Sequence, residues 1–466
     1  MLLGRCPRDR DIWKLTDAAP VRKGPTSPSE VLRVARVVDL DASGMTRPAW
    51  IGALGATLLM QAVASFLTQS LPVLAPLITR NAGLAPEDIG NLAAMVAGGT
   101  ILFLLLGGPL LSRWGPVRTL QVGGALLAAG MLLAAVGTLP ALLLASLLLG
   151  IGYGPSPPAG SRILAATAPP RHRTLIFSIK QAGAPLGGAL AGLVTAPVAA
   201  AFGWTSALLV TVGTAVLAAA AIHPLRARLD AERDPNRSVD LRAIFRSDAL
   251  IAPMAALRLH PLLPPLTLLA MSFAVVQGCL FAFTVTWLVA EHGLSLVQAG
   301  TAFASMQGAG VVARIVLGWL ADRTGQPTRN LVLQAMAATL CVLAFAAMPR
   351  GTPPGGIMLL AGAAGFLAAS WNGLYLAEVA RLVPPAAVGA ATAGSTLFTF
   401  FGYLLGPAGF TLLVSTTGSW LLPFVFVALQ LGLVSMVVFV ALRRISARTA
   451  LFERMGERPS ADPAEP

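Results

Sequence analysis

The chain has 466 residues, of which 56% are hydrophobic and only 11% charged, and its mean hydropathy is +0.75. Soluble domains carry about 25% charged residues, because much of their surface must meet water. The composition therefore excludes a disordered chain and argues against a soluble enzyme. The net charge of +13 does not indicate a nucleic-acid partner, because the basic residues lie between apolar runs and not in one patch.

Apolar runs of the length needed to cross a bilayer, about 20 residues, recur along the whole chain. Run length and the lack of period-2 alternation exclude a β-barrel. Some runs are interrupted by Gly and Pro, as at residues 152–158. The sequence predicts an all-α membrane protein of twelve transmembrane helices, at residues 51–77, 88–111, 117–138, 140–165, 174–201, 204–223, 265–289, 297–320, 330–348, 355–379, 386–414 and 419–442.

The basic residues define an orientation. Of the 33 Lys and Arg residues, only Arg80 and Arg350 fall on one side when alternate loops are counted. The other 31 are assigned to the opposite side, including Lys180 and Arg314, which are placed inside the membrane toward that side. Basic loops stay in the cytoplasm, so both termini are predicted to be cytoplasmic. High Arg, Ala and Gly usage fits a bacterial inner membrane.

The polar stretches divide the chain into segments. The first is basic and lacks the apolar core of a signal peptide, and Met45, just before the first run, is a candidate natural start. The expected order is a cytoplasmic tail (1–48), a six-helix bundle (49–223), a central cytoplasmic loop (224–263), a second six-helix bundle (264–443) and a disordered cytoplasmic tail (444–466).

The second bundle repeats the first in sequence. Gly108 pairs with Gly318, Arg113 with Arg323, and Gly115 with Gly325, each 210 positions apart. Because each half has an even number of helices, both halves begin on the same side of the membrane. The two halves are therefore expected to be related by an axis along the membrane normal. Transporters built this way bind their substrate near the midplane, between the halves.

These repeated residues resemble the loop signature of the major facilitator superfamily, roughly Gly-x-Leu-x-Asp-Arg-x-Gly. The resemblance covers about residues 50–443, and it implies that family's two-bundle fold and a transport function. The two copies here read Gly108-Pro109-Leu110-Leu111-Ser112-Arg113-Trp114-Gly115 and Gly318-Trp319-Leu320-Ala321-Asp322-Arg323-Thr324-Gly325.

In the family, the Asp of this signature latches onto a helix N-terminus in the opposite half, where the helix dipole favours an anion. Ser112 replaces that Asp in the first copy. The latch from Asp322 is therefore expected to dominate the outward-facing state. The glycines would let helix ends approach closely, while Arg113 and Arg323 would anchor the inner face.

No other chemistry competes with transport. The chain has no phosphate-binding GxxxxGK[ST] and no HExxH, and its cysteines show no metal-ligand spacing. A buried Ser/His pair is also missing from the predicted helices. The sequence predicts neither an ATP-driven pump nor an enzyme, and neither a metal nor a cofactor.

Two cations are predicted to lie inside the membrane, where an ionisable group is costly and usually functional. Lys180 is the only lysine outside the N-terminal tail in a chain that otherwise uses Arg. Its alternative is snorkelling to the interface. Arg314 lies at a similar depth in the other half, with lipid phosphate or a helix-end carbonyl as its alternative partner.

Residues 312–318 resemble the eighth helix of monocarboxylate and oxalate/formate transporters, where the Arg binds the substrate carboxylate. A planar guanidinium suits this task, because it grips a carboxylate with two hydrogen bonds. The resemblance is incomplete, since Gln69 stands where the monocarboxylate transporters have Lys, and Gly310 where they have Asp. It therefore does not imply their proton coupling.

Neutral polar residues join the two cations in the helices that line the cavity in this family. A surface ion pair is expected for Glu378 and Arg381. The predicted substrate-binding residues are Lys180, Arg314, Gln69, Gln277, Asn372, Tyr153 and Gln307.

Two deep cations with few deep carboxylates predict an electropositive cavity and a secondary transporter of a small organic anion. A monomer in the bilayer is expected. The alternatives are a proton-driven drug exporter of the same superfamily and a membrane sensor. Exporters have an Arg where this chain has Ser146, and a Pro where it has Ala184. A sensor would need an output domain, for which both tails are too short.

Overall fold

The computed structural model describes residues 39–40, 46–47, 49–169, 172–237, 254–384 and 387–456. The chain divides into two units, residues 1–51 and 52–466. In the first unit, strands β1 (Asp39–Leu40) and β2 (Thr46–Arg47) pair antiparallel. The proposed start at Met45 lies outside the described residues.

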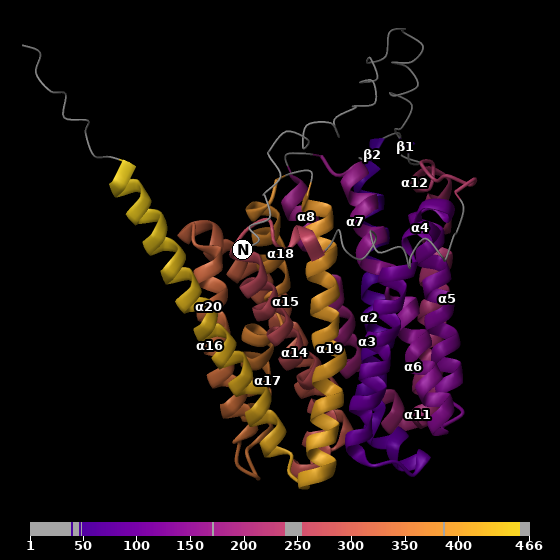
Figure 1. Cartoon of the computed structure of the whole chain (residues 1–466). Helices are drawn as coiled ribbons and strands as arrows, with labels where there is room; N and C mark the ends of the chain where they lie inside the picture. Colours follow the sequence, from indigo (N-terminus) through magenta and orange to yellow (C-terminus); the bar gives the residue numbers. More distant parts are fainter. Residues whose placement is uncertain are drawn as a thin grey trace, which may run out of the picture. The chain divides into compact units, whose positions relative to one another are not determined.

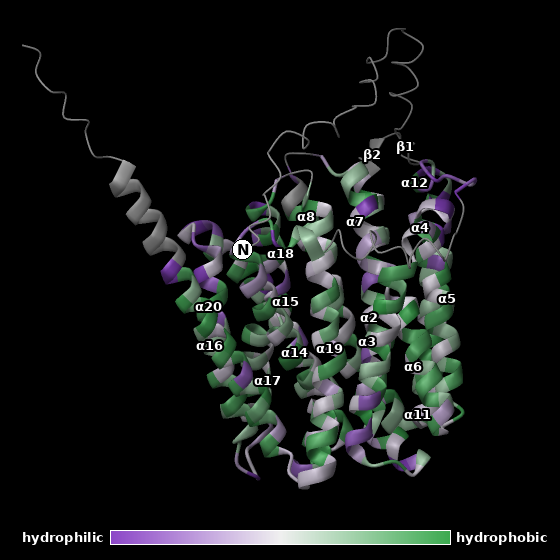
Figure 2. Ribbon diagram, in the orientation of Figure 1, coloured by the Kyte–Doolittle hydropathy of each residue, from purple (hydrophilic) through white to green (hydrophobic). Residues whose placement is uncertain are grey.

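The second unit is helical. In its described residues, twelve helical segments are long and apolar enough to cross a membrane, as predicted. Figure 2 shows hydrophobic residues along the helices and hydrophilic residues gathered near their ends. Leucines such as Leu217, Leu359 and Leu412 are mostly exposed on the outside of the helices, as expected for surfaces that face lipid.

The N-terminal half (residues 49–237) forms one bundle in Figure 1. Its elements are α2 (Ala49–Ala82), η2 (Pro86–Asp88), α3 (Ile89–Leu106), α4 (Gly108–Trp114), α5 (Pro116–Ala134), α6 (Leu139–Tyr153), α7 (Ser156–Thr167), α8 (Arg173–Gln181), α9 (Gly183–Leu190), η4 (Ala191–Thr195), α10 (Ala196–Phe202), α11 (Trp204–Ala221), η5 (His223–Leu225) and α12 (Arg226–Leu229).

The C-terminal half (residues 254–456) has fewer breaks. Its helices are α14 (Leu263–His292), α15 (Leu296–Thr324), α16 (Pro327–Ala346), α17 (Pro354–Ala368), α18 (Asn372–Leu382), α19 (Val388–Thr417) and α20 (Leu421–Gly456).

The expectation of a disordered tail from residue 444 is wrong for residues 444–456, because α20 continues to Gly456. Arg, Ala, Leu, Glu and Met favour helix there, and neither Gly nor Pro interrupts the segment before Gly456. Residues 457–466 lie outside the described part.

Several membrane-crossing segments consist of two helices. The Gly- and Pro-rich stretch at 152–158 does interrupt its helix, between α6 and α7 at Gly154 and Pro155. A second break separates α8 from α9 at Ala182, whose backbone stays right-handed helical. Such breaks are tolerated in a bundle where neighbours satisfy the freed backbone groups.

The two halves pack closely at the end that holds residues 83–90 and 293–300. A Cβ on Gly90 of α3 would lie 2.2 Å from Thr411 Oγ1 of α19. A Cβ on Gly192 would lie 2.2 Å from the carbonyl oxygen of Gly300. Glycine is needed here because any side chain would push the halves apart. Thr411 also donates a hydrogen bond to the carbonyl of Glu87, at 2.7 Å.

Candidate functional site

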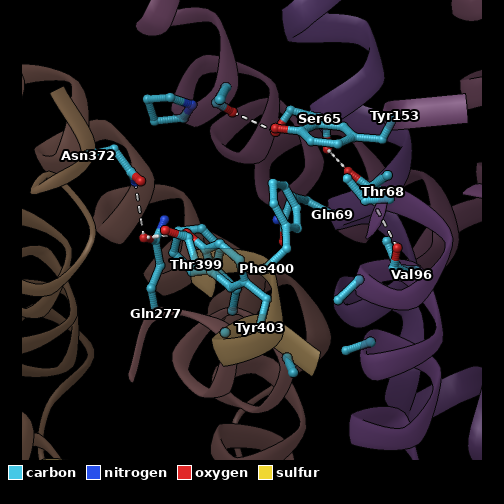
Figure 3. A pocket seen from close by; sticks show the side chains of 18 of the residues that line it. Ser65, Thr68, Gln69, Val96, Tyr153, Gln277, Asn372, Thr399, Phe400 and Tyr403 are labelled. Carbon is cyan, nitrogen blue, oxygen red and sulfur yellow. Dashed lines mark hydrogen bonds between the residues drawn. The ribbon is translucent and has the colours of Figure 1, made fainter. Parts of the chain in front are cut away.

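A cavity of about 260 Å³ lies between the two halves. Helices α2, α3, α6, α7, α8 and α9 line it from one half, and α14, α15, α18 and α19 from the other. Figure 3 shows Gln277, Asn372 and Tyr403 on one side and Ser65, Gln69 and Tyr153 toward the other. The residues predicted from the sequence that line this cavity are Gln69, Tyr153, Gln277, Gln307, Arg314 and Asn372.

Gln277 organises the wall formed by the C-terminal half. Its Oε1 atom accepts hydrogen bonds from Trp371 Nε1 at 3.0 Å, from Tyr403 Oη at 2.8 Å and from Asn372 Nδ2 at 3.5 Å. Because the indole N–H can only donate, the accepting atom must be the amide oxygen. The amide nitrogen of Gln277 therefore faces the other way, and it makes no hydrogen bond with a described residue.

The wall formed by the N-terminal half is less completely bonded. Gln61 Nε2 donates to Tyr153 Oη at 3.2 Å, and Ser65 Oγ donates to the carbonyl of Ala184 at 2.7 Å. In the described part of the chain, the Oε1 atoms of Gln61 and Gln69 are buried without a partner. Gln307 Nε2, from the other half, is buried and unpartnered as well. Unpaired polar atoms are costly, so these atoms are candidate ligand contacts.

Arg314 extends from α15 across to the other half. Its Nη1 donates to the backbone carbonyl of Gln181, at the end of α8. Its Nε is buried and has no partner among the described residues. The guanidinium lines the cavity, so part of its donor capacity remains for a ligand.

Lys180 does not line the cavity with Arg314. Its side chain is buried, 2% exposed, so it does not snorkel to the interface in this structure. Its Nζ lies 3.4 Å from Oε1 of Gln181. A Cβ on Gly160 would lie 2.7 Å from Lys180 Cε, so the missing side chain at Gly160 makes room for the lysine. The two cations are joined through Gln181, one by its side chain and the other by its carbonyl.

None of the residues that line the cavity is acidic. Glu378 lies outside the cavity lining, and its side chain is 0% exposed. The expectation of a surface ion pair is therefore wrong, because the carboxylate is buried. The pair itself forms, because Nε and Nη2 of Arg381 both lie 2.7 Å from the carboxylate. Thr328 donates a further hydrogen bond, which explains how this carboxylate is accommodated.

The two copies of the repeated signature are the first motif segment (residues 108–115) and the second motif segment (residues 318–325). Gly108 begins α4, Arg113 is exposed, and Gly115 has φ +86°. Gly318 lies within α15, and Gly325 ends that helix in the left-handed region.

In the second motif segment, Arg323 lies over the Trp319 ring, 5.5 Å from its centroid. Asp322 is exposed and forms no hydrogen bond or ion pair with the described residues. The latch expected of Asp322 is therefore not engaged in this conformation, and it stays a prediction.

The sequence reading missed Tyr403 and Phe400 of α19, which line the cavity. A signal existed, because the chain has three tyrosines and all three, Tyr153, Tyr375 and Tyr403, line the cavity. In a chain so poor in tyrosine, a tyrosine within an apolar run indicates a cavity-lining position, as a charged residue does. No group of three or more metal-ligand side chains gathers in the described residues.

Residues 57–379 match the model of the Major Facilitator Superfamily. An uncharacterized MFS-type transporter of Mycobacterium tuberculosis is 28% identical over 312 residues, 64% of this chain and 66% of that protein. This chain thus spans just under two thirds of that relative's length. A probable sulfoacetate transporter of Cupriavidus necator is 27% identical, over 81% of this chain and 90% of that protein. A 4-hydroxybenzoate transporter of Pseudomonas aeruginosa is 27% identical, over 55% and 62%.

Two solved structures share the fold. A peptide transporter aligns with a TM-score of 0.68 at 15% identity, covering 84% of this chain and 94% of that one. A bacterial homologue of the human lysosomal transporter Spinster, solved in an inward-facing and occupied conformation, aligns with a TM-score of 0.66 at 15% identity. That alignment covers 86% of this chain and 98% of the other.

Proposed function

This chain belongs to the Major Facilitator Superfamily, and we propose that it is a secondary transporter of a small organic anion that works by alternating access. It is an integral membrane protein, and its described residues hold twelve helical segments that are long and apolar enough to cross a membrane. One observation carries the proposal: the guanidinium of Arg314 lines a cavity between the halves that has no acidic residue in its lining. An anion in that cavity would contact both halves, and alternating access needs such a contact.

Electrostatics support an anionic ligand. Arg314 lines the cavity, and Lys180 adds a second positive charge behind Gln181. A buried charge is costly unless it is paired, so a bound carboxylate would supply the counter-ion that the described residues around Arg314 lack. A cationic drug would find no carboxylate in this lining, which weighs against the exporter alternative.

The size of the cavity supports a small ligand. Typical ligand pockets measure roughly 300–1,000 Å³, and this one measures about 260 Å³. Among the relatives, one is named for sulfoacetate and another for 4-hydroxybenzoate, both small organic acids. We further propose that both termini are cytoplasmic and that the protein is a monomer in a bacterial inner membrane. The distribution of basic residues and the two-bundle fold of the family support this.

The proposal is tested with purified protein and a panel of benzoate, 4-hydroxybenzoate, sulfoacetate and glucuronate. A ligand that binds the folded state raises its melting temperature by mass action, and at least one member of the panel should do so. Arg314→Gln should weaken that binding roughly ten- to a hundredfold, because a hydrogen bond to a charged group contributes about 1.5–3 kcal/mol. Arg314→Lys should not restore it, because an ammonium lacks the planar fork.

Arg350→Gln is the matched control, because Arg350 is exposed, pairs with Glu291 and does not line the cavity. That variant should bind like the wild type. Uptake of the same anion into proteoliposomes then separates transport from mere binding. Stabilisation by cationic dyes, with no response to any anion of the panel, would favour the exporter instead.

A further inference from the structure

Pro185 leaves one backbone carbonyl of the α8–α9 segment without its usual donor. In an α-helix each carbonyl accepts from the N–H four residues later. The helical backbone continues through Ala182, because Ala182 N donates to Ser178 and Leu186 N donates to Ala182, both at 3.1 Å. The carbonyl of Gln181 would accept from residue 185, which is proline and has no N–H.

Arg314 satisfies this freed carbonyl from the other half of the protein. Its Nη1 donates to the oxygen of Gln181, 133 residues away in sequence. Gly310 lies one turn before Arg314, and a Cβ built on Gly310 would be in ordinary van der Waals contact with Pro185 Cβ, at 4.0 Å. Pro185 thus creates the acceptor and lies beside the helix that carries the donor.

A carbonyl is a suitable partner for a guanidinium that must bind an anion. A neutral acceptor holds the side chain in place without cancelling its charge, whereas a carboxylate at this position would neutralise it. With Nη1 held by Gln181, the edge formed by Nε and Nη2 makes no hydrogen bond with the described residues. That edge can donate one hydrogen bond to each oxygen of a carboxylate in the bidentate geometry.

We propose that Pro185 is a positioning residue: by freeing the carbonyl of Gln181 it fixes Arg314 so that the Nε–Nη2 edge faces the substrate carboxylate. This inference rests on the proposed function and deepens it. A pre-positioned guanidinium loses less conformational freedom when the anion binds, and affinity rises for that reason.

The first test is Pro185→Ala. The new N–H would satisfy Gln181 within its own helix, and Arg314 would lose its fixed partner. Affinity for the tightest-binding carboxylate of the panel should fall roughly three- to tenfold, as expected for residues coupled through one hydrogen bond. The matched control is Pro76→Ala in α2, which also removes a proline inside a membrane helix but lies outside the cavity lining. Its affinity should stay at the wild-type value.

A second variant separates the freed carbonyl from the mere bend that a proline causes. Ala184→Pro combined with Pro185→Ala keeps one proline but frees the carbonyl of Lys180, about 100° around the helix. We expect binding to stay as weak as in Pro185→Ala. Recovery of wild-type affinity in this variant would mean that the bend matters and not the carbonyl, and would overturn the inference.

A double-variant cycle ties the effect to Arg314. In an Arg314→Gln background, Pro185→Ala should weaken binding no further, because the group it positions is gone. If Arg314→Gln weakens binding and Pro185→Ala does not, the inference fails and the proposed function stands. If no anion of the panel binds the wild type, or Arg314→Gln leaves binding unchanged, the proposed function fails and this inference fails with it.

Discussion

The first and second motif segments carry the same signature but are held in different ways. In the first, Gly107 interrupts the helix, and α4 and α5 follow as separate helices. Asp230, from the segment after α11, accepts hydrogen bonds from the backbone N–H groups of Val117 at 2.7 Å and Arg118 at 3.1 Å. A buried carboxylate thus caps the N-terminus of α5.

The segment after α11 makes further contacts with the first motif segment. Asp234 N donates to the carbonyl of Ser112 at 3.0 Å. Arg162 of α7 donates to the carbonyls of Leu111 and Glu232, both at 3.5 Å, and so lies between the two segments. The copy that lacks the family Asp is therefore fixed to other parts of its own half.

The second motif segment is freer. Helix α15 runs through it without a break until Gly325, and Asp322 is exposed. A carboxylate without a partner in its own half remains available for the other half. The comparison teaches that one signature can supply an anchor in one half and a movable latch in the other, and the latch is the part that stays a prediction.

The largest expected effect comes from the final glycines of the two segments. Gly115 has φ +86° and ψ 162°, a conformation essentially restricted to glycine, and a Cβ there would lie 2.5 Å from Asp230 Cγ. Gly325 has φ +62° and ψ 12°, and a Cβ there would meet nothing within 4 Å.

Gly115→Ala should therefore lower the free energy of unfolding by on the order of 3 kcal/mol or more. The strained backbone alone accounts for about 1–3 kcal/mol, and displacing a buried carboxylate adds to this loss. Gly325→Ala should cost about 1–2 kcal/mol. Melting temperatures of the two variants in the same detergent provide the measurement. Equal losses would break the comparison, because they would mean that the Asp230 anchor contributes little.

The second prediction concerns the latch. Asp322→Asn should change the free energy of unfolding by no more than about 0.5 kcal/mol, as for an exposed side chain without contacts, so the melting temperature should stay near that of the wild type. Transport should nevertheless slow, because the variant removes the charge that would face a helix N-terminus in the outward-facing state. Uptake into proteoliposomes and melting temperature, measured on the same preparation, separate the two effects.

Ser112→Asp is the complementary change, because it restores the family signature in the first motif segment. It should be tolerated and should slow turnover only by stabilising one state. Wild-type uptake in both Asp322→Asn and Ser112→Asp would mean that neither motif segment controls closure at that end.

The sequence predicts the helices well and the orientation of side chains poorly. Twelve apolar runs and the broken helix at 152–158 follow from hydropathy and from Gly and Pro, which are local properties. Six of the seven predicted binding residues line the cavity, because an amide or guanidinium in an apolar run has few other places to go. Lys180 differs because only packing decides which face of α8 meets the cavity.

Two further features depend on contacts between distant parts of the chain. The bond from Arg314 to Gln181 needs both halves, and the cap from Asp230 needs a segment more than 100 residues away. No period or spacing reveals such pairs. A proline four residues after Gln181 is a local sign that its carbonyl needs another donor, but the sequence does not show which donor arrives.

The smallest expected effect is a pH dependence that belongs to the anchor and not to the latch. Burial raises the pKa of Asp230 above its ordinary 3.8, although Val117, Arg118, Arg226 and Arg233 favour the carboxylate. The folded protein therefore holds this proton to a higher pH than the unfolded chain does. The stabilisation from protonated Asp230 is fully present below pH 3.8 and is lost as pH rises through the raised pKa.

Asp230→Asn removes this titration. As pH rises from about 4 to about 7, the melting temperature of the wild type should therefore fall relative to that of Asp230→Asn. If the wild type instead gains on Asp230→Asn as pH rises, the two backbone N–H groups outweigh burial, and the anchor is stronger when charged than the burial of its carboxylate implies.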